Sequence, residues 1–188
     1  MKRFFLTFVL AFVCMQSFFA IADNKILFGG ALGTGAAIYG NDSVVEQAND
    51  FPRFVIEGDL FAGFVLSKEI RFNLGAVSVC DFHVKGGNHC NLIDYAFYGG
   101  IRVYPNLAGL CIGVDYMLGR RTDFVSLGLP EDGVDSTDWG NGFRFLLEYD
   151  FTAGGTGFAP VVGCGWRHMP RGGSSDNMIS LYFRISHR

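Results

Sequence analysis

Charged side chains recur two residues apart inside otherwise apolar segments of this 188-residue chain. Glu57 and Asp59 form one such pair, and Arg144 and Glu148 share the same side of a later segment. Because an arginine guanidinium can donate two parallel hydrogen bonds to a carboxylate, such residues on facing walls would form a network of ion pairs. The spacing therefore predicts a confined, charge-paired interior, whereas catalysis or metal binding would need other residue types.

Histidine and cysteine residues form one grouping that could bind a metal ion. A hairpin turned at Gly86-Gly87 would place His83 beside Cys90, with three further candidate ligands nearby, Asp81, His89 and Asp94. Such ligands suit zinc or copper. Their spacing matches no established zinc site, so we predict that the protein binds no metal and no other cofactor.

A nucleophile and base are the second chemical possibility. His168 precedes a polar segment with Ser174, Ser175 and Asp176, which supplies a base, a hydroxyl and an acid. The chain contains neither a His-x-Ser pair nor a strained Gly-x-Ser-x-Gly turn. We therefore predict that the protein is not an enzyme, with a lipid-modifying envelope enzyme as the distant alternative.

A period of two in hydrophobicity runs through the chain after residue 22 and predicts strands instead of helices. Turn segments divide this pattern into eight candidate strands, near residues 26–40, 51–66, 70–84, 92–104, 107–119, 142–151, 158–168 and 178–186. Most reach the nine to eleven or so residues that a tilted strand needs to cross a bilayer. The prediction is an all-β fold, an eight-stranded antiparallel transmembrane β-barrel with an up-and-down meander.

Each candidate strand has one apolar face and one face that carries its charges. In segment 70–84, for example, Ile70, Phe72 and Leu74 alternate with Arg71 and Asn73. A register shift of one residue would move the charges to the wrong side, so the register is well specified. We assign the charged face to the lumen, where it would form a network of Arg53, Glu57, Asp59, Arg71, Asp81, Asp94, Arg102, Asp115, Arg144, Glu148, Asp150, Arg167 and Arg184.

A soluble, lipocalin-like barrel with the apolar face inside is the alternative, and three observations count against it. About seven bulky residues from each of eight strands would overfill a lumen of this size. The charged face is also rich in glycine, which suits a crowded interior. Its cations are all arginine, whose planar group can be hydrogen-bonded in a confined network. We therefore expect lipid outside and a charge-lined, plugged lumen inside.

Short and longer connections alternate along the chain, as they do in outer-membrane barrels. Longer polar connections are expected at residues 41–50, 85–91, 120–141 and 169–177. Loops on a rigid barrel tolerate variation and carry binding functions. We predict that the longest one, 120–141, contacts a host or cell-surface ligand through Asp132, Asp135, Asp138 and Trp139.

The N-terminus has the composition of a cleaved signal peptide over residues 1–22. Lys2 and Arg3 precede an apolar stretch, and Ala20-Ile21-Ala22 supplies a cleavage site. Residues 23–188 would then form the exported barrel domain. Two of the 15 basic residues would leave with the peptide, so 13 would remain against 18 acidic ones. This balance argues against nucleic acid as a partner.

The cysteines allow further alternatives. Lipidation at Cys14 would replace ordinary cleavage, although Val13 stands where such sites want a small residue. The remaining four thiols point to different faces, so we expect them to be free and to pack as small apolar groups: Cys80, Cys90, Cys111 and Cys164. A Cys80–Cys90 disulfide is the alternative if the loop between them is irregular.

The chain resembles the small eight-stranded outer-membrane barrels of the OmpA-domain, OmpX and OmpW type. The resemblance is one of pattern, and its last strand, residues 179–185, is similar to the terminal strand that barrel-assembly machinery reads in that class. Here Ser186-His187-Arg188 stands where an aromatic residue usually ends the chain. The resemblance implies an outer-membrane location and contact with outer-membrane lipid and that assembly machinery. We predict a role in envelope integrity and surface interaction, with a narrow, porin-like channel for small solutes as the alternative.

Overall fold

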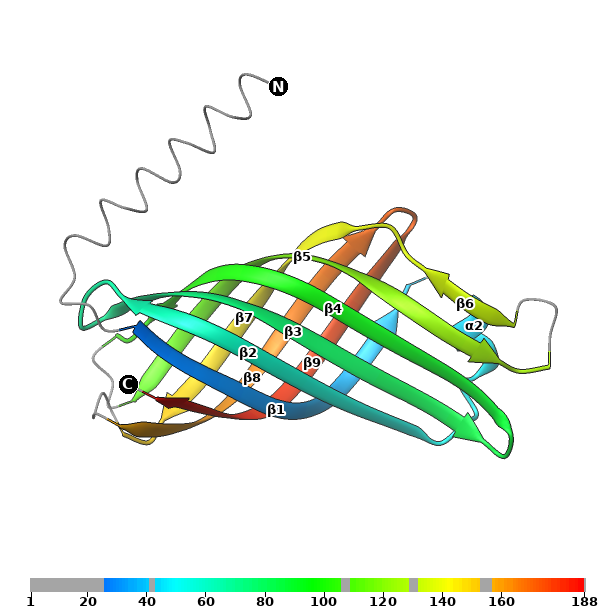
Figure 1. Ribbon diagram of the computed structural model, residues 1–188, viewed down its shortest axis with the longest axis horizontal. Helices are drawn as coiled ribbons and strands as arrows, with labels where there is room; N and C mark the ends of the chain where they lie inside the picture. The colour runs from blue at the N-terminus through cyan, green and yellow to red at the C-terminus, as the bar shows by residue number, and fades with distance from the viewer. Residues whose placement is uncertain (1–25, 41–42, 106–108, 129–131, 153–156, 188) are drawn as a thin grey trace, which may run out of the picture.

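The computed structural model describes residues 26–40, 43–105, 109–128, 132–152 and 157–187, which form a closed antiparallel barrel (Figure 1). Each of its eight wall strands pairs with the preceding one, and β1 pairs with β9 to close the ring. The wall strands are β1 (Ile26–Tyr39), β2 (Arg53–Val65), β3 (Ile70–Lys85), β4 (Asn88–Val103), β5 (Leu110–Ser126), β7 (Gly140–Asp150), β8 (Phe158–Arg171) and β9 (Ser174–His187). The predicted fold and meander are confirmed.

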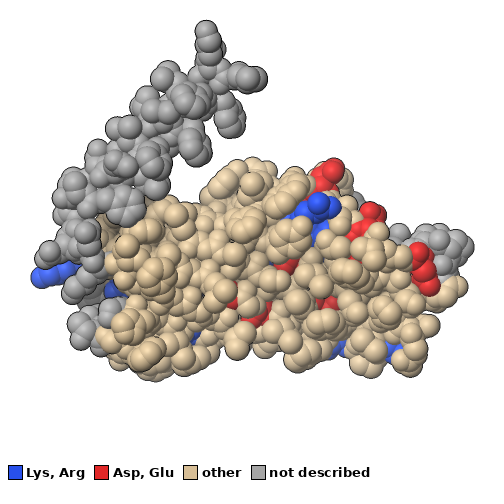
Figure 2. Space-filling model, in the orientation of Figure 1, with Lys and Arg blue, Asp and Glu red and all other residues tan. Residues whose placement is uncertain are grey.

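Alternation along the strands separates the two faces of the wall. In β7, for example, Phe143, Phe145 and Leu147 are about half exposed, whereas Arg144 and Glu148 between them are buried. Large apolar side chains are likewise exposed on the outer face of every wall strand. Most of the middle of the molecule is uncharged in the view of Figure 2, and the coloured charges gather toward the end that carries β6. The apolar face is therefore the outer one, as a membrane-spanning barrel requires.

The two ends of the barrel differ. The described end of the chain at His187 lies beside the start of β1, together with the tight β2–β3 connection (Figure 1). The opposite end carries the short helix α2 (Ser43–Gln47), two hairpins and the extra strand β6 (Gly133–Ser136). None of the helices in the described residues is long and apolar enough to cross a membrane. The predicted signal peptide, residues 1–22, and Cys14 lie outside the described residues.

Two of the connections predicted as long polar loops are tight hairpins instead. β3 continues to Lys85 and β4 begins at Asn88, so Gly86 and Gly87 alone make that turn. β8 and β9 meet in the same way around Gly172 and Gly173. Gly86 and Gly172 have φ of 65° and 56°, a conformation that glycine adopts without strain. The loop bounds 85–91 and 169–177 were wrong because these polar residues lie in strands that run on past the apolar band, whereas the hairpin turned at Gly86-Gly87, with His83 opposite Cys90, is the one the structure has.

The predicted loop 120–141 is also largely strand. β5 extends to Ser126, and β6 pairs with it from Thr122 opposite Ser136 to Val125 opposite Gly133. We call this projecting two-stranded segment, residues 122–136, the β5–β6 arm (Figure 1). Asp132 closes its tip by accepting hydrogen bonds from the backbone N–H groups of Leu127 and Gly128, both at 2.7 Å. The described part of the acidic segment therefore forms a paired strand arm and not a loop.

Candidate functional site in the barrel lumen

Arg144 stands at the centre of the lumen and joins three carboxylates from two other strands. Its Nε donates to Asp115 Oδ2 at 2.8 Å, and its Nη1 donates to Asp59 Oδ2 at 2.9 Å. Glu57 Oε1 lies 3.7 Å from the same Nη1. The guanidinium also lies over the Tyr98 ring, 4.4 Å from its centre. A single cation on β7 thereby ties β2 to β5 across the interior.

Two further arginines extend this central network. Arg102 binds both carboxylate oxygens of Asp115, at 2.5 and 3.0 Å. Arg184 lies 2.7 Å from Glu148 and 3.6 Å from Asp59. Two tyrosine hydroxyls add hydrogen bonds to these carboxylates. Tyr98 donates to Asp59 and Tyr182 donates to Glu148, each at 2.7 Å. These side chains are buried, so pairing and hydrogen bonding are what make their burial tolerable.

A second ionic cluster fills the lumen nearer the β6 end. Asp94 accepts hydrogen bonds from Arg167 at 2.9 Å and from Arg171 at 2.7 Å. Asp176 accepts from Arg171 and, at 3.1 Å, from Arg121. Burial raises the pKa of Asp176, and the positive charges of Arg121 and Arg171 beside it oppose part of that rise. Strands β4, β5, β8 and β9 are thus tied together above the central network.

The connection between β1 and β2 covers the mouth of the barrel at the β6 end. Val45 of α2 and Ala48 pack on Cys90 and Leu92 as one buried apolar cluster. The Ala48 carbonyl lies 3.3 Å from His83 Nδ1. This segment therefore caps the lumen.

A further ion pair, between Arg53 and Asp81, lies below this cap. Asp81 accepts hydrogen bonds from Arg53 Nη2 at 2.6 Å and from the Tyr39 hydroxyl at 2.8 Å. Burial and the Asp81 carboxylate raise the pKa of Tyr39, which stays protonated as a donor. The Arg53 side chain is 35% exposed and reaches the edge of the cap.

The lumen is narrow at the end of the barrel where β1 begins and β9 ends. A small enclosed space there is bordered by Arg102, Glu148 and Arg184, and its volume is about 10 Å³. A cavity needs roughly that volume to hold a single water molecule. Arg71 and Asp150 lie at this end, where Arg71 donates to the Tyr104 hydroxyl at 2.8 Å and Asp150 accepts from Thr152.

The structure places the thirteen predicted lumen residues on the inner wall and buries all of them except Arg53. The prediction missed three buried charges, Arg121, Arg171 and Asp176. Arg121 and Arg171 continue the alternation of strands that were ended too early, and Asp176 belongs to a strand that was begun too late. Had β5 been extended past Gly119, Arg121 would have fallen on the same face as Asp115.

The metal and catalytic alternatives find little support in the geometry. Among the residues that the structure describes, no cluster of three or more metal-ligating side chains occurs, and Cys90 is enclosed in the apolar cap. Ser175 Oγ lies 3.5 Å from His168 Nδ1, but that nitrogen already faces Asn177 Oδ1 at 2.9 Å. Asp176 points into the lumen, away from His168. A serine, a histidine and an acid are therefore not aligned as a relay.

The cysteines of the described chain are free: Cys80, Cys90, Cys111 and Cys164. Cys90 and Cys111 are buried on the inner wall, whereas Cys80 and Cys164 alternate with buried residues on the outer face. The Cys80–Cys90 alternative is therefore not realised in this structure.

The predicted contact group at the arm is split by the structure. Asp132, Asp135 and Asp138 are exposed. Trp139 instead leaves the arm and meets the Tyr95 ring edge-on, with 5.9 Å between ring centres. Its position is on the outer wall of the barrel and not at the tip of a loop.

Comparison with known proteins shows which solved structures this barrel resembles. No protein-family model and no curated protein sequence matches the chain. Two solved structures that do match are Ail, the attachment invasion locus protein of Yersinia pestis, in complex with the heparin analogue sucrose octasulfate, and Neisserial surface protein A. Ail has 7% identity and a TM-score of 0.59 over 86% of this chain and 99% of its own. Neisserial surface protein A has 10% identity and a TM-score of 0.55 over 87% and 99%.

The chain has the fold of the small eight-stranded outer-membrane β-barrels. At these identities the likeness concerns the fold, and the chemistry must be argued from the lumen and the arm of this barrel.

Proposed function

We propose that this protein is an outer-membrane barrel whose lumen is closed by ion pairs and which serves envelope integrity and surface interaction through the β5–β6 arm. The observation that carries the closed lumen is Arg144, whose guanidinium joins Asp115 on β5 to Asp59 on β2 across the interior. The second ionic cluster and the apolar cap lie above it. An eight-stranded barrel leaves an interior just wide enough for side chains, and here those side chains are long and paired.

Stabilisation of the wall is the role of this network. Its members come from β2, β4, β5, β7 and β9, and two of its pairs, Arg144–Asp59 and Arg184–Glu148, connect strands that are not neighbours in the sheet. Removing one partner of a buried pair leaves an uncompensated charge, which is strongly unfavourable. The network therefore resists both opening of the wall and passage of solutes.

Planar-bilayer conductance tests the closed lumen. We expect no current steps from residues 23–188 refolded into the bilayer, with folding verified by the shift in electrophoretic mobility on heating. The double variant Glu148→Ala/Arg184→Ala removes both partners of one pair, so it empties space without stranding a charge. Because the second ionic cluster and the cap remain above that gap, this variant should also stay silent, and a barrel known to conduct, refolded in the same bilayer, shows that the assay detects an open lumen. Stable steps from the unaltered protein would support the alternative, a narrow channel.

The arm is the candidate contact surface. Asp135 and Val134 are exposed on β6, and Val134 is 67% exposed although it is apolar. Ail was crystallised with a heparin analogue, a polyanion. An arm with two exposed aspartates, Asp132 and Asp135, favours a different partner, one with a cationic or mixed polar surface.

Removal of the arm tests this second part of the proposal. Thr122 and Ser136 face each other with their hydroxyl oxygens 3.0 Å apart. A two-residue Asn-Gly turn can therefore replace residues 123–135. We expect cells that display this variant to lose adhesion to host cells while the barrel still folds. Unchanged adhesion would rule out the arm as the contact surface.

A further inference from the structure

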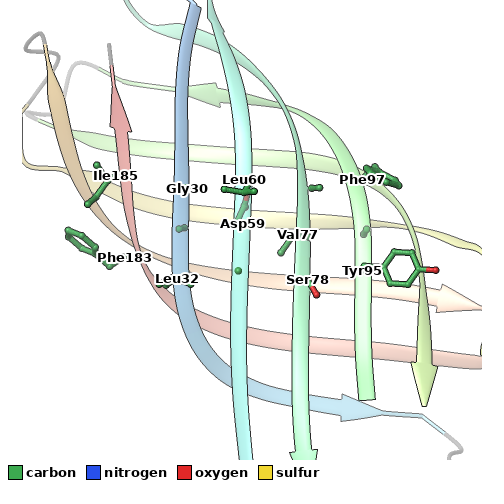
Figure 3. A pocket seen from close by; sticks show the side chains of 14 residues that line it. Gly30, Leu32, Asp59, Leu60, Val77, Ser78, Tyr95, Phe97, Phe183 and Ile185 are labelled. Carbon is green, nitrogen blue, oxygen red and sulfur yellow. The ribbon is translucent and has the colours of Figure 1, made fainter. Parts of the chain in front are cut away.

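A hollow of about 730 Å³ opens on the outer side of the wall, across β9, β1, β2, β3 and β4 (Figure 3). Small residues leave it open: Gly30, Gly58, Ala76 and Ser78. Large outward-facing side chains border it, among them Leu32, Leu60, Phe97 and Phe183. Its volume falls in the range of sites that hold one small molecule, roughly 300–1,000 Å³. Neither the lumen network nor the arm accounts for it.

Gly58 is the position that has no structural reason to be glycine. A Cβ atom built there meets nothing within 4 Å. Glycines of the inner wall are different, since a Cβ at Gly35 or Gly100 would lie within 2.2 Å of backbone or carboxylate oxygen. Gly58 also lies in the middle of β2 and does not adopt a left-handed φ. Glycine weakens a strand interior, and one common reason for it is the close approach of a ligand.

One end of the hollow is polar and aromatic. Gly58, Ser78, Tyr95 and Arg120 are successive cross-strand neighbours on the outer face of β2, β3, β4 and β5. Tyr95 borders the hollow and contacts Trp139 edge-on. Tyrosine, tryptophan and arginine gather where a membrane meets water. Arg120 comes two residues before the part of β5 that pairs with β6, so this row leads from β2 toward the β6 end of the barrel.

Arg120 supplies an unused cation at that end. It alternates with the buried Gly119 and Arg121, so it points outward, and it is only partly exposed. Its Nε has no hydrogen-bond partner in the described part of the chain. Nε is buried in this side-chain position, and a change of rotamer would present the guanidinium to phosphate oxygens, which it can bind in pairs.

We propose that this hollow binds an anionic glycerophospholipid, with an acyl chain against Gly58 and the phosphate on Arg120. Acyl chains are the molecules that surround the outer face of a membrane barrel. The volume of the hollow suits one or two chains, which favours a glycerophospholipid over a glycolipid with many chains. The proposal rests on the membrane placement of the barrel, and it is independent of whether the lumen conducts or the arm adheres.

The two tryptophans of the chain provide a reporter and its control. Trp139 lies beside Tyr95 at the hollow, whereas Trp166 packs on Phe145 of β7, on another part of the wall. In the Trp166→Phe variant the remaining Trp139 reports on the hollow. In the Trp139→Phe variant the remaining Trp166 reports on ordinary lipid contact. Each is folded into mixed vesicles, and quenching by brominated phosphatidylglycerol is compared with quenching by brominated phosphatidylcholine.

We expect Trp139 to show about a fivefold preference for phosphatidylglycerol, the effect of one cation at a membrane surface. Trp166 should show none. In the Trp166→Phe background, Gly58→Leu fills the hollow and Arg120→Gln removes the cation, and each should abolish the preference. Lys85→Gln, which removes an exposed cation at the β3–β4 hairpin, is the matched control and should leave it unchanged.

Two results would overturn the proposal. One is an equal lipid preference at Trp139 and Trp166 in chains that have folded, because the site would then be no different from the rest of the wall. The other is displacement of the brominated lipid by a six-chain glycolipid as effectively as by unbrominated phosphatidylglycerol. A chain that failed to enter vesicles at all would instead contradict the membrane placement, which the heat-shift of mobility reports separately.

Discussion

The two halves of β5 belong to one continuous strand but lie in different surroundings. From Leu110 to Gly119 the strand lies between β4 and β7 and forms part of the closed wall. There Asp115 is fully buried between two arginines, and Val114 beside it faces outward. From Thr122 to Val125 the strand lies between β4 and β6 and projects beyond the barrel.

This comparison shows that closure of the strand ring decides how much a charged side chain destabilises the fold, and that alternation along the strand does not decide it. In the closed half, one face sees only protein and the other only lipid, so a charge must be inward and paired. On β6 of the arm, Asp135 is exposed and accepts a hydrogen bond from the neighbouring Ser136 N–H at 2.7 Å. On β5, in contrast, Asp123 pairs with Arg121 and Val125 packs on the cap. The same residue type is therefore a structural constraint in one half and a free surface group in the other.

Loss of Arg144 should have the largest effect on the closed half. Arg144→Ala leaves Asp115 with one arginine and Asp59 with a distant one, so buried charge is uncompensated. We expect the free energy of unfolding to fall by about 3–5 kcal/mol. Urea unfolding of the vesicle-folded protein measures this. A loss below about 1 kcal/mol would mean that the lumen is wet and the pairs are screened.

A charge placed on the outer face should distinguish the two halves directly. Val114→Arg puts a cation into the apolar band and should cost about 2–4 kcal/mol. Val134→Arg makes the same change on the arm, where we expect an effect within about 0.5 kcal/mol. Equal losses in paired unfolding curves would show that the arm too is immersed in lipid.

Two glycines sharpen the contrast between the inner and outer faces. A Cβ at Gly100 would lie 1.9 Å from Asp115 Oδ1 and 2.4 Å from the Val114 carbonyl. Gly100→Ala should therefore destabilise the barrel by about 1–3 kcal/mol. Gly58→Ala meets open space on the outer face and should stabilise β2 by up to about 1 kcal/mol. The refolding yields and urea midpoints of the two variants test this prediction. A lower urea midpoint for Gly58→Ala than for Gly100→Ala would contradict it.

The smallest effect is expected at the tip of the arm. Asp132→Ala removes the acceptor of the Leu127 and Gly128 N–H groups. The global free energy of unfolding should change by less than about 0.5 kcal/mol, because the arm lies outside the closed wall. Hydrogen exchange at those two amides should nevertheless accelerate. Unaltered exchange would indicate that other contacts hold the tip.

Much of the wall could be predicted because alternation is a local property. Arg71 and Asn73 lie between apolar neighbours in the sequence, and a barrel has only two faces on which they can fall. Strand ends were harder to predict. Polar residues such as Asn88, Ser174 and Asp176 signal a loop in composition, yet they continue strands where the wall rises above the membrane.

The sequence by itself determined the fold class and the inner and outer faces, because a period of two places all charges on one side, and the bulk of the apolar face together with the glycines and arginines of the other face favours enclosing the charges. Only the tertiary structure decided which charges pair, since Arg144 and Asp59 are 85 residues apart and meet solely through ring closure. It also decided that the acidic segment is an arm and that Trp139 lies on the wall beside Tyr95. Contacts across a closed ring depend on the stagger and tilt of all its strands together, and no local stretch of sequence encodes those.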